Sequence, residues 1–327
     1  MLILRLFKNN REGGIVLVIL LAFLTCLITF VRSPETVEWH GMPLYNFLFG
    51  PLAGFPRLSS LLAILIHLIV CLALVRLNLR YSLIEERTFM PALFYLLIVN
   101  AFPLLHQVNP LLIGSLFYLL SFRILIDSHA EPADNYRIFH AFLVFFAGTL
   151  FYARLVWFFP VMLIILLTLR PVTLRELSYP FVAAVFTALL LLTYYWVIED
   201  NLRELSLILQ KNLNFKASLH PLHFSKYLFI GYIFFLTIIS SAFIARGFHI
   251  KKIITRNIYR VLLVMFLFSL VFYFPLSGQN QGAIYFMTIP LTYLLSNYFN
   301  QKSGAFIKEL FIWILIGLGV FVQITAL

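Results

Sequence analysis

Long apolar runs recur along the whole chain, and they constrain its fold more than any other feature of the sequence. Runs of this kind are typical of membrane-spanning helices, since about 20 apolar residues in a helix cross the hydrocarbon core of a bilayer. Composition agrees: 62% of the residues are hydrophobic and 11% are charged, whereas about 25% of a soluble domain is charged. The sequence therefore predicts an all-α, polytopic transmembrane helical bundle.

We expect eleven spans, joined by connections too short to form a soluble core. The chain is then a single integral membrane domain over residues 1–327, and its first span is a retained signal-anchor. The expected spans cover 14–31, 58–75, 88–105, 110–126, 138–153, 156–169, 178–198, 227–245, 259–275, 283–299 and 309–325.

The basic residues predict the orientation. With the N-terminus in the cytoplasm, most of the 24 Lys and Arg fall in cytoplasmic connections, and each of those connections carries at least two. The positive-inside rule thus favours an N-in, C-out chain. It also accounts for the net charge of +11 without nucleic acid as a partner, and the segment 246–260 suits anionic lipid headgroups.

The fifth and sixth segments, 138–153 and 156–169, are short, and Arg154 lies between them. They form either two thin spans or a hairpin that enters the membrane and returns. An arginine at membrane depth costs about 2.5–3.5 kcal/mol on insertion scales unless it finds water, headgroups or a partner. Arg154 is therefore interpreted either as snorkelling to the interface or as facing a cavity and binding a phosphate.

The first long loop on the far side of the membrane, 32–57, carries Glu35, Glu38 and His40 ahead of an aromatic run broken by prolines. A carboxylate at the membrane surface with a cation nearby is the minimum for group transfer from a lipid phosphate. The carboxylate takes a proton from an acceptor hydroxyl, and the cation stabilises the departing phosphate. Glu38 or Glu35 is the candidate base, with Arg154, His40 and His106 as candidate substrate contacts. The competing interpretation is that these are solvated loop charges.

The second long loop, 199–226, has leucines and isoleucine at helical spacing opposite charged residues, which predicts an amphipathic interfacial helix. His220 and His223 in this loop form an HxxH pair without an evident third ligand, so we expect no metal site and no cofactor. Within the expected spans, His67 and Asn100 suit either a polar site for transport or hydrogen bonds between helices. Cys26 and Cys71 both fall in expected spans, which argues against a disulfide.

Two stretches, YRIFHAFLVFFAGTLFYARLVWFFPVMLIILLTLRPVTLRE at 136–176 and SGQNQGAIYFMTIPLTYLLSNYF at 277–299, resemble an uncharacterised family of multi-pass inner-membrane proteins of Bacteroidota. The order of an N-in span, an acidic far-side loop and many short-looped spans is similar to the C-type glycosyltransferase (GT-C) superfamily. Those enzymes use polyprenyl-phosphate sugars and carry an early acidic residue, often in an adjacent pair. The matching positions here, Glu35 and Glu38, are spaced Glu-x-x-Glu.

The first resemblance implies a bacterial inner-membrane protein but no activity. The second implies transfer of a glycosyl or related group from a polyprenyl phosphate at the periplasmic face. Membrane lipids and a polyprenyl-phosphate donor are the partners this implies. Two alternatives stay open. One is a non-catalytic membrane subunit or scaffold of an envelope-assembly machine, with a protein partner. The other is a transporter of lipid-linked substrates.

Overall fold

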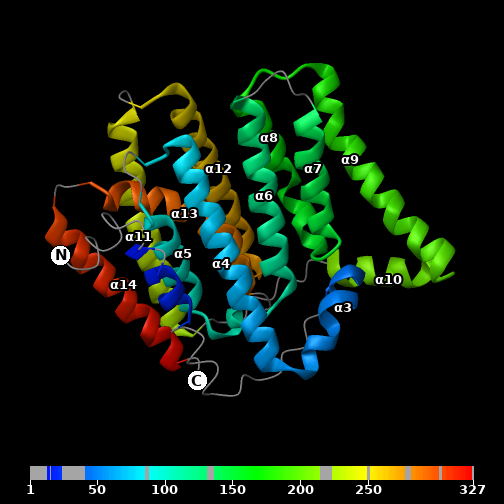
Figure 1. Cartoon of the computed structure of the whole chain (residues 1–327), viewed down its shortest axis with the longest axis horizontal. Coiled ribbons are helices and arrows are strands. Elements are labelled where there is room, and N and C mark those ends of the chain that lie inside the picture. Colours follow the sequence, from blue (N-terminus) through cyan, green and yellow to red (C-terminus); the bar gives the residue numbers. More distant parts are fainter. Residues whose placement is uncertain are drawn as a thin grey trace. The chain divides into compact units, whose positions relative to one another are not determined.

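The computed structural model describes residues 13–14, 16–23, 41–84, 88–130, 136–213, 223–248, 251–276, 281–301 and 304–325 (Figure 1). These residues are helical almost throughout and contain no strand. Glu35, Glu38, His40 and His220 lie outside the described residues. The chain divides into two compact units: unit 1 holds 1–35, 56–107 and 218–327, and unit 2 holds 36–55 and 108–217.

Six described helices are long and apolar enough to cross a membrane, which shows a multi-pass helical membrane protein. They are Pro56–Tyr81, Pro110–His129, Leu174–Val197, Phe224–Arg246, Ile253–Tyr273 and Ala305–Thr325. Three more apolar helices are shorter: Met90–Asn100, Tyr136–Thr149 and Ala153–Leu169. The expected count of eleven spans, the N-in orientation, the single integral domain and the GT-C likeness stay predictions.

Unit 1 is built around one buried helix, α13 (Ile284–Phe299), in which every side chain but that of Tyr298 is buried. It packs against three neighbours, α5 (Met90–Asn100), α11 (Phe224–Arg246) and α12 (Ile253–Leu276). Tyr293 on α13 donates its hydroxyl to the Leu74 carbonyl of α4 (Pro56–Tyr81) at 2.8 Å. The remaining elements are η2 (Pro103–His106), η6 (Gln281–Ala283) and α14 (Ala305–Thr325).

Unit 2 is built around α7 (Tyr136–Thr149), which packs between α6 (Pro110–Ala130) and α9 (Leu174–Thr193). The other elements are α3 (Pro43–Phe49), η1 (Gly50–Gly54), η3 (Ala153–Phe158), α8 (Phe159–Leu169), the π-turn η4 (Tyr194–Ile198) and α10 (Leu202–Leu213). Aromatic side chains fill the core: Tyr118 of α6 meets Phe158 of η3 edge-on, with ring centroids 5.3 Å apart.

Local sequence signals explain where several helices of unit 2 begin. Thr173 caps α9, accepting from the Glu176 N–H, while the Glu176 carboxylate accepts from the Thr173 N–H in a capping box. Proline stands in the first turn of α3 and of α8, where a missing N–H costs nothing. Asp200, with φ of 49°, turns the chain from α9 into α10, and aspartate is among the residues that tolerate this left-handed conformation.

Candidate functional site

The turn between α7 and α8 lies deep beside α6. Phe151 in this turn stacks on Phe117, with centroids 5.3 Å apart, and Phe117 lies seven residues into α6, about 10 Å along its axis. A Cβ on Gly148 would come within 2.7 Å of Phe117 and 2.6 Å of Leu155, so the approach requires glycine. Both forms expected for this segment, two thin spans or a re-entrant hairpin, share this turn.

Arg154 stands on η3 in this turn and is half-buried. Its Nε donates to the carbonyl of Asn212 at 2.9 Å, and its guanidinium lies near the Tyr152 hydroxyl. Asn212 belongs to the last turn of α10, where carbonyls lack partners within the helix and a cation is favourable. Arg154 therefore fastens the end of α10 to the hairpin, a role that neither interpretation of its sequence position had included.

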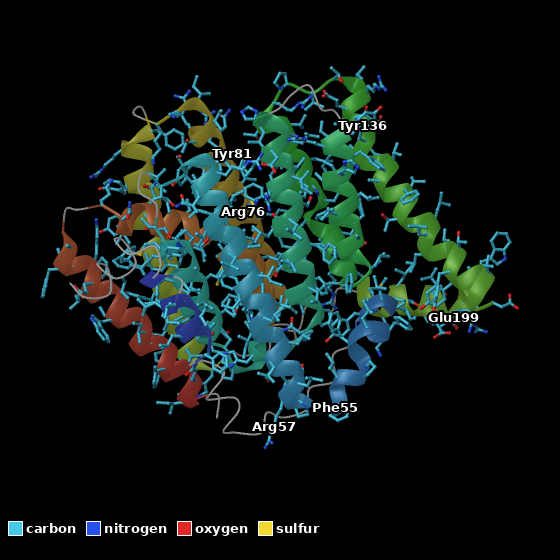
Figure 2. The ribbon with its side chains drawn as sticks, viewed as in Figure 1. Phe55, Arg57, Arg76, Tyr81, Tyr136 and Glu199 are labelled. Atoms are coloured by element: carbon cyan, nitrogen blue, oxygen red, sulfur yellow. The ribbon has the colours of Figure 1, made fainter. Side chains whose placement is uncertain are left out.

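Residues from both long loops pack against the turn that carries Arg154. Met42, which directly precedes α3 within the first loop, donates its backbone N–H to the Phe151 carbonyl at 3.3 Å. The amphipathic helix predicted for the second loop is present as α10, with Leu205 buried and Arg203 exposed. Figure 2 labels Glu199 at the turn that leads into this helix. Within unit 2, the turn carrying Arg154 is thus covered by chain from both loops.

A groove of about 400 Å³ runs between α7, α9, α10 and η3, and we call it the Arg154 groove. Ala153 and Leu213, which line it, are the chain neighbours of Arg154 and of its partner Asn212. The walls are formed by Met42, Phe146, Thr149, Leu150, Ala153, Val156, Ala184, Thr187, Ala188, Leu191, Leu192, Leu205, Leu209 and Leu213.

The groove offers hydrocarbon surface rather than polar partners. Of its lining side chains only Thr149 and Thr187 are polar, and each donates its hydroxyl to a carbonyl of its own helix, of Phe146 and of Ala183. Neither hydroxyl therefore depends on a ligand for a hydrogen bond. Walls of this kind suit an aliphatic or prenyl chain.

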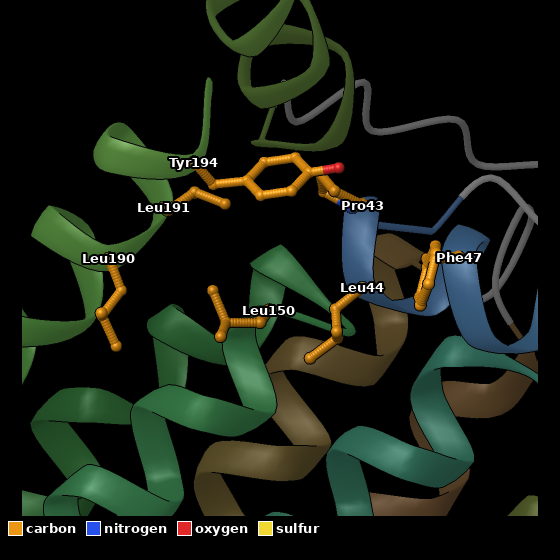
Figure 3. A pocket seen from close by; sticks show the side chains of 7 residues that line it. All are labelled: Pro43, Leu44, Phe47, Leu150, Leu190, Leu191 and Tyr194. Atoms are coloured by element: carbon orange, nitrogen blue, oxygen red, sulfur yellow. The ribbon is translucent and has the colours of Figure 1, made fainter. Parts of the chain in front are cut away.

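A second groove, of about 290 Å³, lies between α3, α7 and α9, and we call it the α3 groove. Its walls come from Pro43, Leu44, Phe47, Leu150, Leu190, Leu191 and Tyr194. Figure 3 shows the Tyr194 ring reaching across it toward Pro43. Leu150 and Leu191 line both grooves, so the two adjoin.

His106 belongs to η2 of unit 1, where it is 3% exposed, whereas the residues that line both grooves belong to unit 2. Burial lowers the pKa of His106 to about 4, against a smaller opposing effect of its hydrogen bond to the Asn100 backbone. The imidazole is therefore neutral at physiological pH. The predicted substrate contact at His106 lies in a different unit from Arg154.

His67 serves as a hydrogen-bonded link between helices. Its Nε2 faces the Leu105 carbonyl at 3.4 Å and must donate, because a carbonyl only accepts. Its Nδ1 then accepts from the Tyr95 hydroxyl at 2.9 Å. The interpretation of this residue as a hydrogen bond between helices accounts for both ring nitrogens.

No group of three or more His, Cys, Asp or Glu that could hold a metal occurs in the described part of the chain. His223 pairs with a hydroxyl instead, its Nδ1 lying 3.0 Å from the Ser225 Oγ.

Sequence reasoning missed the two grooves. One signal was present: Ala184 and Ala188 lie one turn apart on α9 and leave that face without bulk. The expected base, Glu38 or Glu35, lies outside the described residues, four and seven positions before Met42. Comparison with protein-family models, with curated proteins and with solved structures finds no match to this chain.

Proposed function

We propose that unit 2 binds a polyprenyl phosphate and that the protein transfers a glycosyl or related group from it at the far face of a bacterial inner membrane. The observation that carries this is the apolar groove, two of whose lining residues are the chain neighbours of Arg154 and of its partner Asn212. A guanidinium has five N–H donors, so holding α10 does not by itself exclude a phosphate contact.

The chemistry follows from the charges involved. The carboxylate of Glu38 or Glu35 takes the proton of an acceptor hydroxyl. The hydroxyl oxygen then attacks the carbon by which the transferred group is joined to the phosphate. The bond from that carbon to the phosphate oxygen breaks, and the phosphate leaves with one more negative charge. Arg154 stabilises that charge, which is larger in the transition state than in the bound donor.

Binding is tested with the purified full-length protein by native mass spectrometry, using a long-chain polyprenyl phosphate and the matching polyprenol. Ala188→Trp fills the Arg154 groove and is expected to reduce binding of both lipids at least tenfold. Val185→Trp, on the exposed face of the same helix, is the control. Arg154→Gln is expected to remove the preference for the phosphate, while Arg203→Gln keeps it. Equal binding in all four variants contradicts the proposal.

Transfer is tested separately, with Glu35→Gln, Glu38→Gln and the double variant in cells. We expect the double variant to lose function at unchanged membrane abundance. Full function in the double variant would show that neither carboxylate is the base. It would not contradict the proposed binding of a polyprenyl phosphate.

The non-catalytic subunit is a second candidate, and one observation favours it. Only 22% of the most apolar part of α9 is buried, and Val182, Val185 and Leu189 on this helix are more than half exposed. A partner span could cover that face. In that case Val185→Trp, rather than Ala188→Trp, is the variant that loses function.

A further inference from the structure

One end of unit 1 gathers cations from two segments far apart in the sequence. Lys251, Lys252, Arg256 and Arg260 come from the turn before α12 and its first turns, and Arg80 comes from the end of α4. The Tyr259 hydroxyl donates to the Leu83 carbonyl at 2.8 Å and ties these segments together. Figure 2 labels Arg76 and Tyr81 at this end of α4. We call these five cations the basic end.

The described residues of unit 1 carry little negative charge, and Glu85 and Glu86 lie outside them. Among the described residues of this unit, Glu309 on α14 is the one acidic side chain, and the first turn of α12 contains none. The N-terminus of α12 adds the positive end of a helix dipole. Lys252, Arg256 and Arg260, around the start of this helix, therefore attract an anion from outside the protein.

Two of these cations lie over aromatic rings. The Lys251 Nζ lies 4.8 Å from the centre of the Tyr259 ring, and the Arg260 Cζ lies 5.9 Å from that of Phe248. The Nε of Arg256 is buried and has no hydrogen-bond acceptor among the described residues. A buried donor without an acceptor is unfavourable, so an arriving oxyanion would satisfy it.

Exposed apolar side chains stand beside the cations. Ile253 is 67% exposed and Ile254 is 41% exposed, directly after Lys252. A soluble anion would not contact these isoleucines. A lipid would contact the cations with its phosphate and the isoleucines with its hydrocarbon chains. Two candidate membrane spans, Pro56–Tyr81 and Ile253–Tyr273, have an end here.

We propose that the basic end of unit 1 binds the phosphate headgroup of an anionic membrane lipid. Lys252, Arg256 and Arg260 contact the phosphate, and Ile253 and Ile254 lie against its acyl chains. This site is independent of the transfer function proposed for unit 2. The charge pattern of the chain predicts that it faces the cytoplasm.

The test uses the full-length protein in detergent and native mass spectrometry, with phosphatidylglycerol, phosphatidylcholine and inorganic phosphate as probes. We expect the wild type to retain phosphatidylglycerol in preference to phosphatidylcholine. Replacing Lys252, Arg256 and Arg260 by glutamine should weaken that preference about fivefold for each charge removed. The charge-matched control replaces Arg123, Arg137 and Arg175 of unit 2 and should keep it.

Two further variants separate the contributions. Arg256→Lys retains the charge and should keep most of the preference, which guards against a folding defect in the triple variant. Ile253→Ser combined with Ile254→Ser should reduce retention of phosphatidylglycerol. The proposal is overturned if the wild type shows no preference, if the control loses as much as the triple variant, or if inorganic phosphate displaces the lipid.

Discussion

Unit 1 fills its centre with a helix, whereas unit 2 leaves a groove along one of its helices. Tyrosine hydroxyls on α12 and α13 reach carbonyls of neighbouring segments, as Tyr259 does at Leu83 and Tyr285 at Leu105, and these bonds close the interior of unit 1. In unit 2, α7 and α8 have only 14 and 11 residues. The short helices leave the Ala184 and Ala188 face of α9 to be covered by α10.

This difference between the two units indicates where each of them can bind a ligand. Buried polar side chains of unit 1 such as His67 and Tyr293 are already paired inside the bundle, and the ligand site proposed for this unit is its basic end. Unit 2 instead places a half-buried cation beside empty apolar volume. Stability should therefore depend on different contacts in each unit, and three changes test this.

The largest effect is expected from the buried ion pair of unit 2. Arg170 pairs with Glu176, and their side chains are 9% and 3% exposed. Glu176→Gln leaves the Arg170 charge buried without its counter-ion and should cost about 3–5 kcal/mol. Hydrogen exchange should rise in peptides of unit 2 and stay unchanged in unit 1. The control, Asp127→Asn, removes the looser pair with Arg123, at 3.9 Å, and should cost about 1 kcal/mol or less.

The next effect belongs to unit 1 and depends on pH. The pKa of His106 is lowered from 6.5 to about 4 by burial, so protons bind the unfolded chain first as the pH falls. Stability is complete above about pH 6.5 and declines by about 3 kcal/mol as the pH approaches 4. Thermal unfolding between pH 7.5 and 4.5 measures this. His106→Gln should flatten the profile, and an unchanged slope would assign the dependence to other groups.

The smallest of the three expected effects on stability comes from a comparison of one glycine in each unit. Gly148→Ala places a Cβ against Phe117 and Leu155 and should cost about 1–3 kcal/mol by overpacking. Gly231→Ala on α11 meets nothing within 4 Å and should be neutral or slightly stabilising, since alanine favours a helix. Melting temperatures of the two variants in detergent decide this. Equal losses would show that the hairpin of unit 2 adjusts to the added methyl group.

The sequence predicted the all-helical membrane bundle well, because long apolar runs allow few other folds. It also singled out Arg154 from the cost of an arginine at membrane depth. It could not identify Asn212 as the partner, 58 residues away, because that contact depends on how α10 returns to the hairpin. The grooves escaped prediction for the same reason, since small side chains on α9 become a wall only when other helices stop short.

The buried position of α13 has a consequence for the order in which the protein is made. Unit 2 ends at residue 217, but unit 1 combines residues from both ends of the sequence and closes around a helix that finishes at Phe299. During synthesis, unit 2 can complete its packing before α13, the helix that contacts both α4 and α5, has been made. A ribosome stalled once residue 217 has cleared the exit tunnel, but before α13 is made, should thus expose a finished unit 2 and an incomplete unit 1. The carbonyls of Leu74 and Leu105, which accept from tyrosines of α13, are then not yet occupied.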